Sequence, residues 1–211
     1  MTRLAEDGDI RSPVTGGPTS VADLFNARSI IERWNRQGFD VASYFDGLDT
    51  AQLRRCDDTG YRFFYPPSVA GEAEFYDMMD PATFEDPDYR HWSDEFQFAL
   101  DRIGADERVL DVGCGYGYFL ERAVERASAS GVEANVHAQR RAAAKGLNVL
   151  HGSAEDFAGE LAGTFDVVCT FQTLEHIFEV RSFFQALAAA EAGGAADRRR
   201  SEQRDVSRTL Q

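Results

Sequence analysis

The chain has 211 residues, of which 43% are hydrophobic and 16 are Phe, so it is long enough for one domain with a sizeable core and an extension. Its 22 basic and 36 acidic residues give a net charge of −14, which argues against a nucleic-acid binder and against binding to anionic membranes. A small-molecule partner, or a neutral or cationic substrate, fits this charge better.

The start of the chain shows no charged and then apolar leader, and no apolar run approaches the roughly 18 residues of a membrane span. The three cysteines are far apart and odd in number, so they predict neither a disulfide framework nor a C-x-x-C metal site. We therefore expect a cytoplasmic protein.

The N-terminal part divides at about residue 20. Residues 1–20 are rich in glycine, proline and polar side chains, which predicts a disordered lead-in. Residues 21–104 are expected to form an N-terminal extension. Its first element is a predicted helix from Val21 to about Gly38, because apolar side chains recur there at helical spacing, at Leu24, Ala27, Ile31 and Trp34.

Aromatic residues crowd the segment from residue 39 to residue 98. Residues 61–65 predict a strand that Pro66 and Pro67 stop, and residues 72–79 and 91–103 predict two further helices. We favour the interpretation that these aromatic side chains cap the sheet of the following domain. A dedicated ligand platform is the alternative.

Residues 108–120 carry the strongest pattern in the chain. An apolar run around Asp111 predicts a buried strand, and a helix follows, because Phe119, Leu120, Ala123 and Val124 recur at helical spacing. Glycines occupy every second position between them, at Gly113, Gly115 and Gly117. Residues without a Cβ allow positive φ angles and let a ligand approach the backbone closely. The pattern predicts a nucleotide-type binding turn; a glycine-rich turn without a ligand is the alternative.

The spacing of the glycines excludes two common nucleotide motifs. The dinucleotide fingerprint G-x-G-x-x-G needs a glycine where Tyr118 stands, and a P-loop needs Gly-Lys-Ser/Thr, although the only lysine is Lys145. The remaining pattern, Val-Leu-Asp-Val-Gly-Cys-Gly-Tyr-Gly over 109–117, resembles the first motif of class I S-adenosylmethionine (SAM)-dependent methyltransferases. Residues 40–100 also resemble the lead-in of bacterial methyltransferases of the domain-12 and domain-23 types, which often covers the SAM pocket or helps to form the acceptor site.

This resemblance implies SAM as the cofactor and assigns roles within the turn. Gly113, Gly115 and Gly117 would make room for SAM, with Cys114 among the cofactor-binding residues, and Asp111 would fix the turn and the methionine end. Beyond the turn, helices and strands alternate, which predicts a Rossmann-like, doubly wound parallel α/β sheet.

A predicted second strand over 129–133 ends in Glu133. This glutamate lies 22 residues after Asp111, about where doubly wound domains keep the carboxylate that accepts both ribose hydroxyls. We predict this role for Glu133; an ordinary surface glutamate is the alternative.

The third predicted strand, over 147–152, leads into Ser153, Ala154, Glu155 and Asp156. The resemblance implies that Ser153 and Ala154 lie beside the adenine ring and that Glu155 or Asp156 accepts its amino protons. The sequence leaves the choice between the two acids open. Alternatively, both acids only favour the start of the next helix.

The fourth predicted strand, over 165–170, should adjoin the strand that precedes the glycine turn. Phe171 and Gln172 at its exit should then face the methionine part of SAM. The run from Leu174 to Ile177 resembles the family's Leu-Glu-His-Ile/Val motif after this strand. Within it, His176 is a candidate base for an acceptor hydroxyl. Because relatives with unlike acceptors carry the same motif, a structural role is the alternative. We predict no metal site, since Glu175 and His176 lack further ligands.

The end of the chain departs from the family pattern. After a predicted helix over 183–190, relatives show Lys-Pro-Gly-Gly and an apolar fifth strand, whereas residues 191–211 form a polar, arginine-rich tail. Codons can be chosen for Glu191–Gln203 that, read one base later, encode Lys-Pro-Gly-Gly-Leu-Leu-Ile-Val-Ala-Val-Pro-Asn. We therefore predict a frame slip near residues 188–190, an aberrant disordered tail, and a partial SAM-binding core over 105–190.

The predicted sheet is incomplete, with about four strands and an exposed edge at the fourth, where Phe165, Val167 and Val168 should be partly exposed. We interpret the protein as a methyltransferase that moves a methyl group from SAM to a small-molecule acceptor. The alternative is an inactive, marginally stable methyltransferase fragment that binds SAM weakly or not at all. The acceptor and the oligomeric state are left open.

Overall fold

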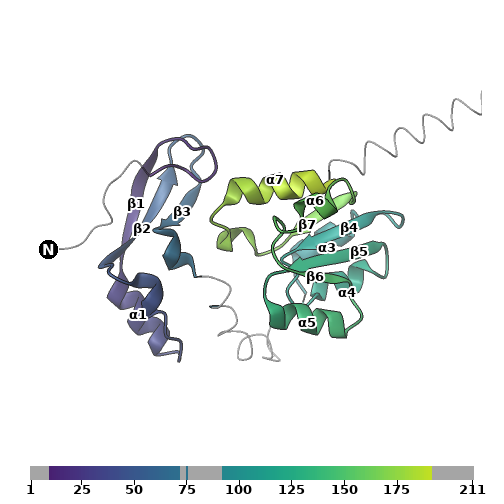
Figure 1. Ribbon diagram of the computed structural model, residues 1–211, viewed down its shortest axis with the longest axis horizontal. Coiled ribbons are helices and arrows are strands. Elements are labelled where there is room, and N and C mark those ends of the chain that lie inside the picture. The colour runs from purple at the N-terminus through teal and green to yellow at the C-terminus, as the bar shows by residue number, and fades with distance from the viewer. Residues whose placement is uncertain (1–9, 72–74, 76–91, 192–211) are drawn as a thin grey trace, which may run out of the picture. The chain divides into compact units, whose positions relative to one another are not determined.

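The structure is a computed structural model that describes residues 10–71, 75 and 92–191 (Figure 1). The chain divides into two compact units, one from residues 1–85 and 175–181 and the other from residues 86–174 and 182–211. The predicted helix over 72–79, apart from Phe75, and the predicted tail beyond residue 191 lie outside the described residues. Within the described part, no helix is long and apolar enough to cross a membrane.

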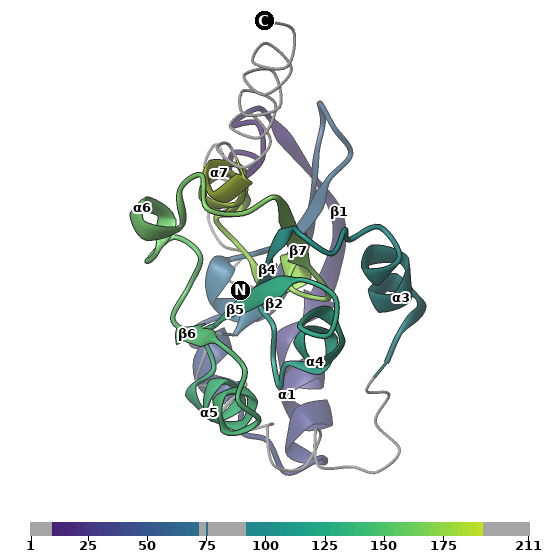
Figure 2. The same cartoon turned by 90° about the vertical axis from the view of Figure 1, so that its right-hand side faces the viewer.

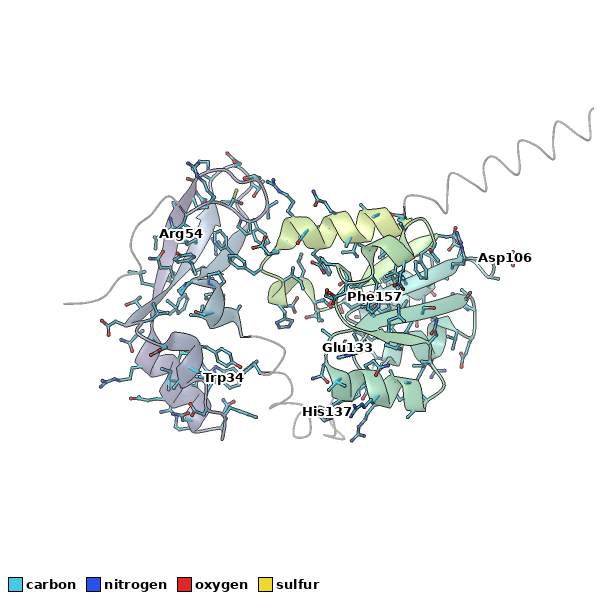
Figure 3. All side chains as sticks on the ribbon, in the orientation of Figure 1. Trp34, Arg54, Asp106, Glu133, His137 and Phe157 are labelled. Atoms are coloured by element: carbon cyan, nitrogen blue, oxygen red, sulfur yellow. The ribbon has the colours of Figure 1, made fainter. Side chains whose placement is uncertain are left out.

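The N-terminal unit contains a three-stranded antiparallel sheet in the order β1-β2-β3. Its strands are β1 (Thr19–Asn26), β2 (Thr50–Cys56) and β3 (Arg62–Tyr65). The prediction of β3 is confirmed. The sequence did not predict β2, because buried polar side chains break its apolar pattern: Arg54, labelled in Figure 3, donates to Gln52 Oε1 at 2.6 Å and to Thr19 Oγ1 at 2.9 Å.

The predicted helix from Val21 was wrong at its start, and the strand β1 also begins inside the predicted lead-in. Residues 19–26 pair with β2 from Thr19 opposite Cys56 to Asn26 opposite Thr50. Helix α1 (Ala27–Asn35) starts only after Asn26, whose side chain accepts a hydrogen bond from the Ser29 N–H at 2.9 Å. This N-cap ends the strand and starts the helix, so one apolar stripe runs through two kinds of structure.

The aromatic side chains of the N-terminal unit pack on one another. The ring of Trp34, on α1, lies edge-on to Phe39 and to Phe75, with centroids 5.9 and 5.2 Å apart. A small core of Ala27, Val41, Phe45 and Ala51 lies beneath them. These rings therefore build their own core. Phe96 in the C-terminal unit behaves as predicted, because it packs against the core of the parallel sheet.

The C-terminal unit contains a four-stranded parallel sheet in the order β6-β5-β4-β7. The strands are β4 (Arg108–Val112), β5 (Ser128–Glu133), β6 (Val149–His151) and β7 (Val167–Thr170). The strand β4 is the first of the four in the chain and pairs with β5 on one side and β7 on the other. The predicted Rossmann-like sheet is confirmed, with its switch point between β4 and β7.

Helices cover both faces of this sheet (Figure 1, Figure 2). α4 (Tyr118–Ala123) and α5 (Val136–Ala144) lie on one face and α7 (Val180–Glu191) on the other, and the shorter helices are α3 (Asp94–Leu100) and α6 (Ala158–Leu161). A core cluster on the α4 side includes Val109, Phe119, Leu120 and Ala142.

The strand β7 is an edge of the described sheet, as predicted, and Val167 and Val168 are half-buried. The expectation that Phe165 is partly exposed was wrong, because only 6% of it is exposed. The end of α7 explains the difference: the Phe165 N–H donates to the Ala190 carbonyl at 3.2 Å, so the helix end lies beside this residue.

Candidate cofactor site at the glycine turn

The turn after β4 has the backbone conformation that the sequence predicted. Gly113, Gly115 and Gly117 have φ angles of +76°, +53° and +77°, a region that other residues avoid. The Gly113 N–H donates to the Val132 carbonyl of β5 at 2.8 Å, and α4 begins directly after Gly117. The turn is therefore anchored to the neighbouring strand and opens into a helix N-terminus.

The three glycines differ in what surrounds them. A Cβ on Gly113 would collide with the side chain of Thr173, and one on Gly117 would collide with Leu147. A Cβ on Gly115 would meet nothing within 4 Å. Gly113 and Gly117 are thus required by packing, whereas Gly115 borders open space. Only Gly115 has the surroundings that a closely approaching ligand needs.

Cys114 contributes its backbone to the turn, because its side chain faces the core. The residue is buried, and a Cβ on Gly131 of β5 would collide with its sulfur. Burial, with the nearby Asp111 and Glu133 charges, raises the pKa of the Cys114 thiol. Cys114 is therefore a packing residue at this turn and not a nucleophile.

Glu133, labelled in Figure 3, ties the end of β5 to the glycine turn. Its Oε2 accepts a hydrogen bond from the Gly115 N–H at 2.7 Å, and its Oε1 accepts one from the Asn135 N–H at 2.7 Å. Each carboxylate oxygen can accept more than one hydrogen bond. The two hydrogen bonds therefore hold the carboxylate in one orientation beside the open glycine.

Asp111 is buried under the turn and has an unsatisfied oxygen. It lies in β4 between Gly131 and Cys169 of the adjacent strands, and only 2% of it is exposed. Within the described residues, its Oδ1 has no hydrogen-bond partner. Burial, with a smaller contribution from the negative charge of Glu133, raises the pKa of Asp111 to about 8. A cation close to this carboxyl would oppose the shift and favour its ionised form.

Lys145, at the end of α5, binds the backbone of the glycine turn and the helix that follows it. Its Nζ donates to the Tyr116 carbonyl and to Glu121 Oε2, both at 3.0 Å, and lies 4.6 Å from the centre of the Tyr118 ring. In the sequence, this lysine served only to exclude a P-loop. The one signal in the sequence was that a chain with a single lysine places it 28 residues after the last glycine of the motif.

The loop after β6 separates the two acids between which the sequence could not choose. Asp156 Oδ2 accepts from the Ser153 N–H at 2.8 Å and from the Ser153 hydroxyl at 2.9 Å. These two hydrogen bonds lower the pKa of Asp156. Ala154 is buried and Glu155 is exposed. Asp156 therefore holds the loop, and the Glu155 carboxylate stands outside this hydrogen-bonded turn.

The two residues after β7 differ in role. The ring of Phe171 packs against Phe96 and Phe119, with centroids 4.8 and 4.9 Å apart, so much of this side chain belongs to the core. Gln172 is exposed and has a φ of +51°, and its Nε2 donates to Glu95 Oε1 at 3.3 Å. A left-handed residue other than glycine is uncommon and is often found at functional sites.

His176 belongs to the N-terminal unit, whereas the glycine turn belongs to the C-terminal unit. Its Nε2 lies 4.0 Å from Glu175 Oε1. Burial lowers the pKa of His176 below 6.5, and the Glu175 charge partly opposes this shift. In the described ranges, no group of three or more His, Cys, Asp and Glu side chains could hold a metal ion.

Comparison with known proteins identifies the family. Residues 84–196, more than half of the chain, match the sequence model of a family described as a methyltransferase domain. The chain belongs to this methyltransferase-domain family. Its fold and motifs are those of class I SAM-dependent methyltransferases, as the sequence predicted, and the cofactor of that class is SAM.

Several known methyltransferases are similar to this methyltransferase-domain chain. The ubiquinone biosynthesis O-methyltransferase of Cronobacter sakazakii is 32% identical over 136 residues, which cover 53% of this chain and 55% of the relative. The protein of the same name from Aromatoleum aromaticum is 35% identical over 91 residues, covering 40% and 39%. The chain thus spans about half the length of the curated relatives it matches.

Solved structures of methyltransferases also match. SAM-bound CalS10, an amino pentose methyltransferase from Micromonospora echinaspora, is 30% identical with a TM-score of 0.41, over 48% of this chain and 46% of that one. A SAM-dependent methyltransferase from Archaeoglobus fulgidus is 23% identical with a TM-score of 0.42, over 46% and 45%.

The site of this methyltransferase domain fits SAM chemically. SAM carries a positively charged sulfonium and an ammonium group, and the buried Asp111 Oδ1 is an acceptor without a partner in the described residues. SAM also carries a ribose with two adjacent hydroxyls, and Glu133 presents a fixed carboxylate beside the open Gly115. The residues present therefore suit the positive charge and the ribose hydroxyls of the cofactor.

Proposed function

We propose that the protein binds SAM at the carboxyl ends of β4 and β5 and transfers its methyl group to a small-molecule acceptor. One observation carries the proposal: the Glu133 carboxylate bonds to the N–H of Gly115, the one glycine of the turn that borders open space. A fixed acceptor beside an open backbone is what a ribose requires. None of the comparisons favours an inactive fragment.

The proposed roles follow the site from one end of the cofactor to the other. Glu133 holds the ribose hydroxyls, and Asp111 stabilises the cationic methionine end. Ser153, Ala154 and Glu155 border the adenine, with Glu155 preferred over Asp156 because Asp156 is already bonded to Ser153. Gln172 lies along the methionine part, and Phe171 supports it from the core.

When bound, SAM supplies a methyl group on a positively charged sulfur. The sulfur is a good leaving group, so the methyl group is readily transferred. The protein has to align an acceptor atom with that methyl and to exclude water. The glycine turn fixes one partner through backbone contacts. Rigid positioning by Glu133 and Lys145 supports the required alignment.

His176 is the proposed base for an acceptor hydroxyl. Its pKa is lowered by burial, so the imidazole is neutral at pH 7 and able to accept a proton. The rate should rise as pH increases through this lowered pKa and level off by neutral pH. His176→Gln should reduce kcat by about 10²–10⁴-fold while leaving SAM affinity unchanged. An unchanged pH–rate profile in this variant would assign His176 a structural role.

The acceptor class proposed first is a hydroxyl compound, because the relatives named above are O-methyltransferases by name. The net charge of −14 argues against a nucleic-acid acceptor. Cys56, Cys114 and Cys169 are all free, which suits the reducing cytoplasm.

Two measurements test the proposal. Calorimetric titration with SAM and with its demethylated product should show one binding site for each in the full chain. A screen of hydroxyl-containing metabolites with methyl-labelled SAM should then show transfer to at least one of them. Binding without transfer to any acceptor would support the inactive alternative, and absence of binding would overturn the proposed site.

A further inference from the structure

Two turns of the N-terminal unit, residues 12–17 and 56–61, repeat one backbone design. They lie 44 positions apart in the sequence, and both close with the same two backbone hydrogen bonds. In the first turn, the Ser12 N–H donates to the Gly17 carbonyl (3.0 Å) and the Gly16 N–H to the Ser12 carbonyl (2.8 Å). In the second turn, the Cys56 N–H donates to the Tyr61 carbonyl (2.7 Å) and the Gly60 N–H to the Cys56 carbonyl (2.8 Å).

The repetition extends to side chains and to backbone angles. The fourth residue is a threonine in both turns, and its hydroxyl accepts from the N–H two residues later: Gly17 to Thr15 Oγ1 (3.0 Å) and Tyr61 to Thr59 Oγ1 (3.3 Å). The fifth residue is a glycine in both, with a φ of +71° at Gly16 and +78° at Gly60. The two turns are therefore structural duplicates with different sequences.

The first and fourth residues of both turns converge on one point, the sulfur of Cys56. The nearby hydroxyls of Ser12, Thr15 and Thr59 lower the pKa of the Cys56 thiol to about 6. Thr15 Oγ1 lies 3.5 Å from Sγ. Ser12 is 3% exposed and Cys56 is fully buried, so the centre of the cluster is closed to solvent.

A structural zinc site takes its four ligands from two turns, at the first and fourth positions of each. The four side chains here have the same arrangement. Such sites use two C-x-x-C turns, whose four thiolates surround the metal tetrahedrally. Here one of the four positions is a cysteine and the other three are hydroxyl residues, which are not among the ligands that zinc prefers. Within the described chain, no cluster of three or more usual metal ligands exists.

We propose that Ser12, Thr15, Cys56 and Thr59 occupy the four ligand positions of a zinc-ribbon-type site, in which side-chain hydrogen bonds to the Cys56 sulfur replace the metal. The hydrogen-bonded cluster would stabilise the N-terminal unit. The unit has a three-stranded sheet and a small core, and small units of this kind commonly need a disulfide or a metal to hold them. The hydrogen-bonded cluster joins the start of β1 to the end of β2 and makes the unit independent of metal.

The triple variant Ser12→Cys/Thr15→Cys/Thr59→Cys tests the ligand geometry in the full chain. It should bind about one Co²⁺ per chain with the absorption spectrum of a tetrahedral thiolate site, and Zn²⁺ should displace the cobalt and raise the melting temperature. The matched control is Ser29→Cys/Ser43→Cys/Ser68→Cys, which adds three exposed thiols to the same unit outside the two turns. A folded triple variant that binds no more cobalt than this control would overturn the proposal.

A single variant covers the case in which the triple variant does not fold. Ser12→Cys places a second thiol against Cys56, and mild oxidation should join the two in a disulfide that mass spectrometry detects. Ser29→Cys should form no disulfide with Cys56. Equal oxidation of the two variants would contradict the convergence of the turns.

The wild-type chain tests the replacement itself. Purified from zinc-supplemented cells, it should contain no stoichiometric zinc, and a chelator should not change its melting temperature. Stoichiometric zinc in the wild type would overturn the claim that hydrogen bonds have replaced the metal. SAM binding is measured in the other unit, so these outcomes are separate from the proposed function.

Discussion

The glycine turn of the C-terminal unit and the paired turns of the N-terminal unit use the same materials for different purposes. Both contain glycines with positive φ, and both bury an ionisable side chain. At the glycine turn, the Asp111 Oδ1 has no partner in the described chain, and Gly115 borders open space. At the paired turns, the hydroxyls of three side chains lie near the Cys56 thiol, and that of Thr15 is 3.5 Å from its sulfur. An unsatisfied buried group beside open backbone indicates binding, and a satisfied one indicates structure.

The largest effect expected is on folding and comes from the packing glycine of the turn. Gly117→Val puts a Cβ into Leu147 at a φ of +77°, and we expect it to lower the free energy of unfolding by about 3–5 kcal/mol. The Cβ of Gly115→Val meets no neighbouring atom within 4 Å, so we expect mainly the backbone strain of about 1–3 kcal/mol. Urea unfolding measures both, and equal losses would remove the distinction between a packing glycine and a binding glycine.

The second effect is the pH dependence that Asp111 gives to stability. The native state keeps the Asp111 proton up to about pH 8, whereas the unfolded chain releases it near the ordinary value of 3.8. The unfolded state therefore binds fewer protons between these values, and the free energy of unfolding should fall as pH rises from about 4 to about 8. Asp111→Asn should remove a few kcal/mol of this fall. Denaturant unfolding at pH 5 and pH 8 gives this fall in each protein. An equal fall in the wild type and in Asp111→Asn would contradict the prediction.

The third effect concerns the ribose and separates Glu133 from the other acids near the site. Glu133→Gln keeps the shape but loses a charged acceptor, so SAM affinity should fall by about 1.5–3 kcal/mol. Glu155→Gln, at an exposed carboxylate, should cost less than about 1 kcal/mol. Calorimetric titration gives both values. If the two losses were equal, the fixed orientation of Glu133 would have no special part in binding.

The smallest effect is expected from Lys145, which contacts the turn from outside. Lys145→Met removes the hydrogen bond to the Tyr116 carbonyl and the partly exposed ion pair with Glu121, so SAM affinity should fall by about 0.5–1.5 kcal/mol. Lys145→Arg should recover part of this loss because it keeps the charge. Unchanged affinity in the Met variant would show that the turn keeps its shape without this contact.

Local signals made the C-terminal unit predictable. An apolar run, three glycines and a helical stripe are adjacent in the sequence, and they gave the strand β4, the turn and α4 correctly. The predicted strand over 129–133 placed Glu133 at a strand end, and β5 does end at Glu133. Its bond to Gly115 could not be read from the sequence, because it depends on the side-by-side pairing of two strands.

Non-local contacts explain what the sequence did not predict in the N-terminal unit. The residues of β1 formed an apolar stripe continuous with α1, and only pairing with β2 and the Asn26 cap divide them. The paired turns lie 44 positions apart and contain only one cysteine between them, Cys56, so no C-x-x-C motif indicated them. The likeness of the two turns lies in their backbone hydrogen bonds, which the residue types do not predict.

The central claim, that the open glycine marks the place where SAM binds, is tested most directly by titrating SAM into Gly115→Val. The control is Gly38→Val, which also has a positive φ and open space around the added Cβ but lies in the N-terminal unit. We predict that Gly38→Val binds SAM like the wild type and that Gly115→Val shows no binding while keeping the wild-type circular dichroism spectrum. Wild-type SAM affinity in Gly115→Val would contradict the claim.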